Sequence, residues 1–381
     1  MRVVEVTDRD GLAAHRAAWE TLRAGADGGD FFQSFEWLQP WVDTYWSAGG
    51  LAFLFVYEGD DLVAVGPFAR DDAGSVHCAG ALATPVNPHV RRQGILYRGD
   101  VERPLTAMVE HLKANGRGCR IVFKQLVADE PLARALPSLA GRLGFRTLPW
   151  TETSSSLADL SAGWDAYVAS RKRQVVREIK RKWRKLDQEG GWAVQIHADG
   201  SDWREGFAAV VAVEERSWKH PQGTSIANEP GARAFYEEVA RLSAERGWLT
   251  VYVLTRGGVP VAHVMGVADR GRFLALKTAY DQEHQKSAPG AVLMWRAVED
   301  AARRGCTAFD FLGDSAPWKS SFGTLEQEHV SLCFFPKLRP GCEVCRATEI
   351  GLKPCGRRLG VDRLVHRLRA FRDQRPAPPA P

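Results

Sequence analysis

The chain has 381 residues, of which 45% are hydrophobic and 25% charged, so its composition is that of a globular protein with room for two domains. Its net charge of +5 is small for this length and indicates only that anionic partners are tolerated. The sequence has no run of about 18 apolar residues, no apolar signal-peptide core after Met1, and seven scattered cysteines that favour reduced thiols, so we expect a cytoplasmic protein.

The apolar pattern of the first part of the chain predicts a strand, two helices and a β-hairpin. Ser34 is the predicted N-cap of the second helix, whose aromatic face is a stripe for the core. The aromatic residues of this stripe are Trp37, Trp41 and Tyr45. The other elements are expected in residues 2–7, 12–22, 51–58 and 61–70.

A strand and a basic helix are predicted in the middle of the chain. Residues 143–150 favour a strand that ends a first unit, and residues 151–156 a polar connector. The segment 171–185 holds nine Lys or Arg and the single acid Glu178. Apolar residues recur there at helical spacing, so we expect an amphipathic helix, most simply one packed on a sheet with a solvated basic face. The apolar residues are Val168, Val175, Ile179, Trp183 and Leu186.

A second hairpin, predicted in residues 248–255 and 259–268, repeats the design of the first. Two helices are expected before it, joined by a polar loop that is either a substrate lid or plain surface. Aligning the two hairpins makes the chain two copies of one α/β unit with mixed (α+β) sheets. The expected divisions are residues 1–155, residues 156–340 and a tail over residues 341–381.

The stretch from Phe273 to Lys319 carries the strongest functional signal. It predicts a strand over residues 273–280, a turn of small residues, a helix over residues 290–304 and a second strand from Cys306. Small residues at the helix start leave its unpaired N–H groups and partial positive charge open to an anion such as a phosphate.

The motif Gln285-x-x-Ala288-x-Gly290 resembles the pyrophosphate-binding turn of the GNAT superfamily of acyl-CoA-dependent acyltransferases. Together with Tyr280-Asp281 before it and Trp318-Lys319 after the second strand, it resembles the cellulose-biosynthesis-type (CelD/BcsL) branch, which is similar in turn to the tandem-GNAT Fem aminoacyltransferases. The branch usually has tyrosine where this chain has Trp318. The resemblance implies a tandem GNAT fold with two similar α/β units packed together, of which the N-terminal one is degenerate.

The first unit lacks the phosphate turn and has residues 81–100 in its place. This segment includes His89, Arg91 and Arg92, which we expect to pack on the partner unit, with the lining of a shared cleft as the alternative. In the second unit, Asp310 alternates with two phenylalanines and is expected to pair with Lys319 or Arg296.

The resemblance implies that an amine attacks an acyl thioester, with acyl-CoA as cosubstrate and no metal. The residues that it places at the CoA phosphates are Gln285, Lys286, Ser287, Ala288, Pro289, Gly290 and Ala291. The candidate catalytic residues are Glu215 as the general base, Tyr280 as a proton donor to the thiolate, Asp281 beside it, Lys319 at the donor or the substrate, and His263. A histidine inside a strand is more often a packed core residue, so Glu215 is the stronger candidate base.

We therefore predict an acyl-CoA-dependent N-acyltransferase for an amine of a sugar, a peptide or a sphingoid-type lipid made at the membrane surface, with ceramide synthase-like activity as one form. The alternatives are Fem-like aminoacyl transfer from tRNA and a non-catalytic role in exopolysaccharide biosynthesis. Residues 171–185 would accordingly contact the 3′-phosphoadenosine of CoA, an acidic lipid surface or tRNA, and DNA is not an expected partner.

The C-terminal tail offers a thiol cluster and a second basic segment. Cys342, Cys345 and Cys355 could hold zinc only with a fourth donor such as His366, so no metal is predicted. Residues 357–372 favour a basic amphipathic helix that either anchors peripherally to an anionic membrane, as residues 171–185 would, or docks on the protein.

Overall fold

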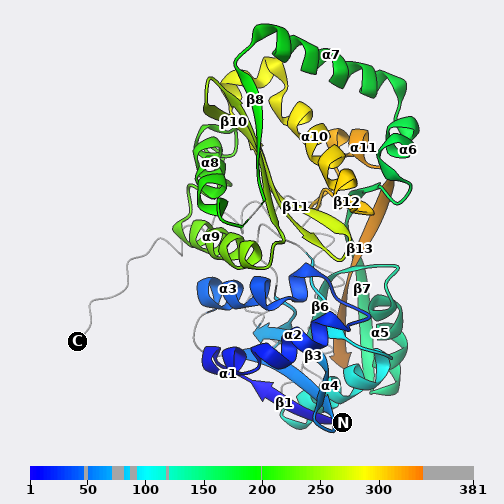
Figure 1. Cartoon of the computed structure of the whole chain (residues 1–381). Helices are drawn as coiled ribbons and strands as arrows, with labels where there is room; N and C mark the ends of the chain where they lie inside the picture. Colours follow the sequence, from blue (N-terminus) through cyan, green and yellow to red (C-terminus); the bar gives the residue numbers. More distant parts are fainter. Residues whose placement is uncertain (47–49, 71–80, 86–91, 117–119, 199, 338–381) are drawn as a thin grey trace, which may run out of the picture.

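The computed structural model describes residues 1–46, 50–70, 81–85, 92–116, 120–198 and 200–337. Its strands form one 13-stranded mixed sheet with helices on both faces (Figure 1). Among the described residues, no helix is both long and apolar enough to cross a membrane. The thiol cluster and the basic segment predicted in the tail lie outside the described residues.

The N-terminal half of the chain supplies one end of the sheet. Its strands are β1 (Arg2–Val6), β2 (Leu51–Glu58), β3 (Asp61–Arg70), β4 (Leu82–Ala83), β5 (Leu96–Tyr97) and β6 (Ile121–Val127). Its helices are α1 (Arg9–Ala14), α2 (Arg16–Ala24), η1 (Phe31–Gln33), α3 (Phe35–Tyr45), α4 (Glu102–Ala114) and α5 (Pro131–Arg142).

The C-terminal half supplies the other end. Its strands are β8 (Trp192–His197), β9 (Leu249–Arg256), β10 (Val259–Asp269), β11 (Arg272–Tyr280) and β12 (Ala308–Asp310). Its helices are α6 (Gly163–Ser170), α7 (Arg173–Glu189), α8 (Trp203–Arg216), α9 (Pro230–Glu245), η2 (Gln282–Ser287), α10 (Pro289–Arg303) and α11 (Pro317–Phe322). Two long strands, β7 (Phe145–Asp159) and β13 (Leu325–Pro336), join the two ends.

The two halves repeat one order of elements, as the paired hairpins predicted. In each half an outer strand and helices precede an antiparallel hairpin, β2–β3 or β9–β10. A further strand, a helix and a parallel strand follow, as β4–α4–β6 and as β11–α10–β12. The mixed α/β architecture of two similar units is therefore confirmed. The predicted N-cap is confirmed too, because the Trp37 N–H donates to Ser34 Oγ at 3.2 Å.

Strands β7 and β13 make the sheet continuous, in the order β1-β2-β3-β4-β6-β13-β7-β12-β11-β10-β9-β8, and the thirteenth strand, β5, pairs with β3 off this path. β13 pairs with β6 of the first half, and β7 pairs with β12 of the second half at residues 157–159. The predicted polar connector at residues 151–156 is wrong, because these residues are part of β7 and pair with β13. The serine and threonine residues there show no alternation of apolar side chains that would predict a strand. Their backbone N–H and C=O groups nevertheless find hydrogen-bond partners in β13.

The helices divide the core into layers. A single apolar cluster runs through both halves on one face of the sheet, beneath α1, α2, α3, α8 and α9. On the other face, α4 and α5 cover the first half, and α6, α7 and α10 cover the second. The two halves are therefore joined by a shared core as well as by strands (Figure 1).

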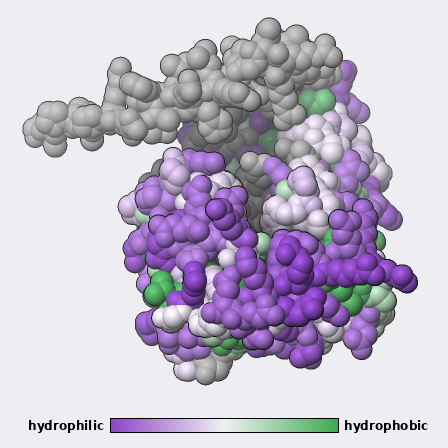
Figure 2. Space-filling model, turned by 90° about the horizontal axis from the view of Figure 1, so that it is seen from above, coloured by the Kyte–Doolittle hydropathy of each residue, from purple (hydrophilic) through white to green (hydrophobic). Residues whose placement is uncertain are grey.

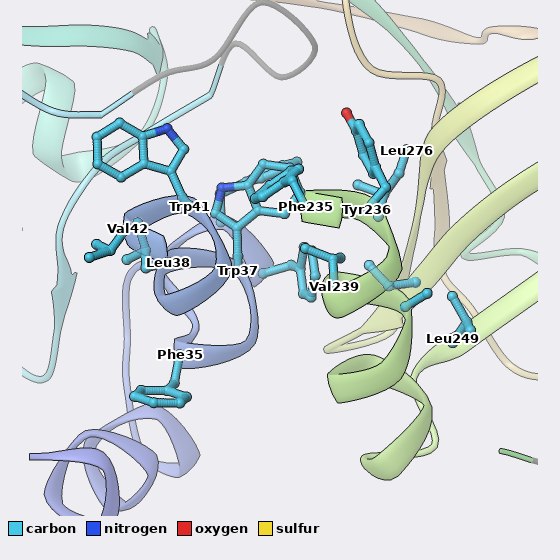
Figure 3. Close-up of a cluster of buried hydrophobic side chains, with 14 of the residues drawn as sticks. Phe35, Trp37, Leu38, Trp41, Val42, Phe235, Tyr236, Val239, Leu249 and Leu276 are labelled. Atoms are coloured by element: carbon cyan, nitrogen blue, oxygen red, sulfur yellow. The ribbon is translucent and has the colours of Figure 1, made fainter. Parts of the chain in front are cut away.

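Helices α3 and α9 meet through aromatic side chains at this junction (Figure 3). The rings of Trp37 and Phe235 are 4.8 Å apart and nearly perpendicular, and both side chains are buried. Edge-to-face contacts of this kind add to the burial of apolar surface. The predicted aromatic core stripe is thus confirmed for Trp37 and Trp41, and its partner is the other half of the chain.

We expect Trp37→Ala to lower the free energy of unfolding by about 3–5 kcal/mol, because it leaves a large cavity between α3 and α9. Thermal unfolding followed by circular dichroism measures the effect. Trp218→Ala is the matched control, since Trp218 is 41% exposed and its loss should cost less than about 1 kcal/mol. Equal destabilisation by the two variants would contradict a core that joins the halves.

Candidate active site

Strands β11 and β12 diverge near the middle of the sheet. They pair in parallel at only three positions, from Arg272 opposite Ala308 to Leu274 opposite Asp310, where β12 ends. Farther along β11, the Asp281 N–H donates to the Val261 carbonyl of β10 at 2.7 Å. Since alternate residues point their backbone groups to opposite edges, those of residues 278 and 280 face the divergence. Distal β11 therefore offers backbone donors and acceptors on its open side.

A β-bulge in β11 turns a lysine toward α8 and α9. Leu274 lies opposite Val267, but Lys277 lies opposite Met265, so β11 accommodates one extra residue. Lys277 is buried, and its ammonium lies 5.0 Å from the ring centroid of Tyr236 on α9. The bulge thus places a cation on a face that is otherwise apolar core.

Helix α8 brings a carboxylate to the same place. Glu214 is fully buried, and its Oε1 lies 3.1 Å from Lys219 Nζ and 3.6 Å from His263 Nε2. Lys219 Nζ also donates to the Thr278 carbonyl at 2.6 Å, which puts it at the open side of β11. Glu214, Lys219, His263 and Lys277 are called the Glu214 cluster below.

The loop after α8 closes over this cluster. The Ser225 hydroxyl donates to the Glu214 carbonyl at 3.1 Å, and both Ser225 and Ile226 are buried. The centre of the polar loop is therefore packed, whereas residues 221–224 are exposed, and its role as a substrate lid or as plain surface stays a prediction.

Burial and neighbouring charges set the protonation of the cluster. Burial alone raises the pKa of Glu214, but His263, Lys219 and Lys277 outweigh it and hold that pKa well below the usual range. Burial lowers the pKa of His263, which is therefore neutral at pH 7. Burial and repulsion from Lys219 lower the pKa of Lys277 to about 8, against the attraction of Glu214 and Glu229. The cluster can therefore accept and donate protons near neutral pH.

The start of α10 has the geometry of an anion site. Ala288 has a left-handed backbone, Pro289 is the first helical residue, and no side chain caps the helix. A Cβ atom at Gly290 would lie 3.0 Å from the Tyr280 ring, so the turn is tightly packed against the end of β11. Gln285 and Lys286 are exposed at the end of η2. Helix α10 begins one residue before the predicted start.

Arg92 reaches from the N-terminal half to the end of β12. This buried guanidinium lies 2.7 Å from Asp310 Oδ2 and 3.0 Å from Asp30 Oδ2. Asp310 Oδ1 accepts the Leu312 N–H at 2.9 Å, and the Leu312 carbonyl accepts Lys319 Nζ. The N-terminal half therefore supports the backbone that holds Lys319.

The predicted partners of Asp310 are wrong. Asp310 pairs with Arg92, with Arg272 at 3.9 Å, whereas Arg296 pairs with Glu299 on its own helix. The sequence gives no register between segments 218 residues apart. The expected packing of Arg92 on the partner unit is confirmed, and His89 and Arg91 lie outside the described residues.

The structure brings only some of the predicted catalytic residues together. His263 joins the Glu214 cluster and Tyr280 packs at the start of α10, but Glu215 is exposed on α8. The Asp281 carboxylate accepts a hydrogen bond from Arg216 Nε at 2.7 Å and one from the Glu283 N–H at 3.0 Å. It therefore stabilises the start of η2. Burial lowers the pKa of Lys319, against the attraction of Asp314 and Asp310.

Sequence reasoning missed three members of the cluster, Glu214, Lys219 and Lys277. Helical spacing from Phe207 through Val210 and Val211 puts Glu214, and not Glu215, on the buried stripe, so this signal was present. Lys277 carried no such signal, because the strand period is broken by the bulge.

One protein-family model and several solved structures are similar to this chain. Residues 170–320 match the family model of the acetyltransferase (GNAT) domain. None of the curated proteins compared matches the chain. The crystal structure of FemX is similar with a TM-score of 0.59 and 12% identity, covering 87% of this chain and 97% of that chain.

Two further solved structures are similar along most of their length. One is the C-terminal domain (DUF2156) of a putative lysylphosphatidylglycerol synthetase from Agrobacterium fabrum, with a TM-score of 0.55, 11% identity and coverage of 91% and 98%. The other is a conserved protein of unknown function from Bacteroides thetaiotaomicron, with a TM-score of 0.54, 15% identity and coverage of 87% and 99%. Residues 170–320 are therefore similar to a GNAT domain, in a chain whose fold is similar to that of FemX.

Proposed function

We propose that the chain is an acyl-CoA-dependent N-acyltransferase whose active site lies where β11 and β12 diverge. The observation that carries this proposal is the uncapped start of α10 directly beside the open side of β11. A helix start binds phosphate oxygens, and the open strand edge can hold an extended arm by backbone hydrogen bonds. Together they fit a thioester joined to a diphosphate.

The Glu214 cluster supplies the proton transfers of this proposal. The acceptor ammonium loses a proton to neutral His263, and its nitrogen then attacks the carbonyl carbon of the thioester. The C–S bond breaks as Lys219 gives a proton to the departing thiolate, and the neutral Lys219 amine then takes the second proton that the nitrogen loses when the amide forms. Glu214 stabilises both cations. Tyr280 and Lys319 remain candidate contacts to the donor, and the role of general base predicted for Glu215 passes to His263, which Glu214 supports.

The acceptor in this proposal is an amine on a sugar, a peptide or a sphingoid-type lipid. The basic helix α7 supports an acceptor made at an anionic membrane surface, since its cations face outward. The acyl donor would then include long chains, as in a ceramide synthase-like reaction.

Aminoacyl transfer from tRNA is the second candidate, because the fold is similar to that of FemX and α7 could contact RNA. Calorimetry separates the two candidates. Heat of binding with CoA or acyl-CoA supports acyl transfer from acyl-CoA. No heat with CoA, together with salt-sensitive binding of tRNA, supports aminoacyl transfer. No binding of CoA, acyl-CoA or tRNA would favour a non-catalytic role.

We expect Gly290→Glu to abolish CoA binding in calorimetry, because the new side chain brings bulk and negative charge to the start of α10. Gly141→Glu is the matched control, since Gly141 lies in α5 and a Cβ atom added there would meet nothing beyond its own helix within 4 Å. The control should bind CoA as the wild type does. Unchanged binding by Gly290→Glu would remove the α10 start from the proposal.

We expect Glu214→Gln to lower kcat/KM about 10²- to 10⁴-fold, the usual contribution of acid–base catalysis. Glu214 raises the pKa of Lys277 and of His263, so neutral glutamine lets both values fall. Any inflection that these groups cause in the pH–rate profile therefore moves to lower pH. The folded state of the variant is checked by its thermal unfolding.

Glu215→Gln is the control for this experiment, because Glu215 is exposed one residue farther along α8. It should keep the wild-type rate and the wild-type pH profile. If Glu215→Gln instead flattens the profile while Glu214→Gln does not, Glu215 is the base and the assignment of the proton transfers to the Glu214 cluster fails.

A further inference from the structure

Helices α6, α7 and α10 enclose a groove of about 430 Å³ on the face of the sheet opposite the Glu214 cluster. This volume lies within the range of about 300–1,000 Å³ that is usual for small-molecule sites. One indole from each helix lines the groove, and these are Trp164, Trp183 and Trp295. The groove reaches α10 at Val292, in the first turn of that helix, and no residue of β11 or β12 is among its lining residues.

The floor of the groove is apolar and already ordered. Trp164 and Trp295 meet edge to face at 5.0 Å, and the Arg296 guanidinium lies 4.3 Å above the Trp183 ring. Arg296 pairs with Glu299 at 2.9 Å, so its charge has a partner. An apolar ligand would therefore meet a preformed aromatic surface.

The rim of the groove holds two cations with no carboxylate partner among the described residues. Lys180 and Arg184 line it from α7, and neither forms an ion pair with any described residue. They differ in this from Arg181 and Lys182, which share Glu178. The lining also holds the carboxylates Asp165 and Glu299 beside the cations Lys180, Arg184 and Arg296, so the groove combines an apolar floor with a net positive charge.

The cationic rim continues along the outer face of α7. Seven of its neighbouring Lys and Arg residues are exposed, namely Lys172, Arg173, Arg177, Lys180, Arg181, Arg184 and Lys185. Figure 2 looks onto the side on which α7 lies in Figure 1, and this face is largely hydrophilic with small hydrophobic areas. A row of cations along a 17-residue helix matches a surface that carries many anions, more than one bound phosphate requires.

We propose that the groove and the outer face of α7 bind an anionic phospholipid in a membrane surface. An acyl chain lies over the indoles, the lipid phosphate lies at Lys180 and Arg184, and the remaining cations of α7 contact neighbouring headgroups. RNA would use the cations but has no aliphatic chain for an apolar groove. The assignment does not depend on CoA binding or on acyl transfer.

Sedimentation with vesicles tests whether the cations of α7 bind an anionic membrane surface. The wild type should bind vesicles that contain phosphatidylglycerol and not vesicles of phosphatidylcholine alone. The double variant Lys180→Gln and Arg184→Gln should lower the partition constant about 30-fold, because each cation contributes about 1 kcal/mol at an anionic surface and 1.4 kcal/mol is tenfold. Equal binding by variant and wild type would overturn the proposal.

The matched control removes the same charge elsewhere. Arg103→Gln with Arg134→Gln neutralises two exposed arginines of α4 and α5, at the opposite end of the molecule. This control should bind the vesicles as the wild type does. An equal loss in the control would show that net charge, and not α7, governs binding.

A soluble ligand tests the groove itself. Dihexanoyl-phosphatidylglycerol should bind in calorimetry, whereas its deacylated headgroup, glycerophosphoglycerol, should not. Val168→Phe narrows the groove and should weaken binding of the dihexanoyl lipid, with the thermal unfolding temperature as the check on folding. Equal binding of lipid and headgroup, or binding of RNA in preference to both, would overturn the proposal.

Discussion

The pairing of β7 with β13 is the constraint on which the rest of the structure depends. The two strands pair from Leu325 opposite Leu157 to Pro336 opposite Phe145, and this ladder spans both halves of the sheet. β13 pairs through backbone hydrogen bonds with β6 of the first half, and β7 pairs in the same way with β12 of the second half. Neither half therefore completes its sheet without a strand that continues into the other.

This continuity fixes the place of the charged groups at the candidate site. A buried carboxylate is stable only with a nearby cation or donors, and Glu214 and Asp310 each have such partners. The partner of Glu214 comes from the same half, whereas Asp310 needs Arg92 from the other half. Through Arg92, the N-terminal unit supports the residues that follow β12.

The sequence predicted local features well where one physical signal controlled them. The hairpins followed from strand period and turn residues, and α10 from helical spacing with Pro289 and Gly290 at its start. It failed where pairing at long range decided the outcome, as for the strand at residues 151–156. It named Glu215 as the candidate base, and the apolar spacing of α8 puts the neighbouring Glu214, not Glu215, on the buried side of the helix.

By itself, the sequence determined the repeated α/β unit, the aromatic stripe of α3, the turn of small residues before α10 and the cationic character of α7, because each depends on residues close in the chain. Only the tertiary structure decided the register of β7 and β13, the partner of Asp310, the bulge that buries Lys277 and the groove between α7 and α10. The physical reason is that burial and charge pairing act between segments whose separation in the chain leaves no local period. Residue spacing predicts which face an element buries, but not what it is buried against.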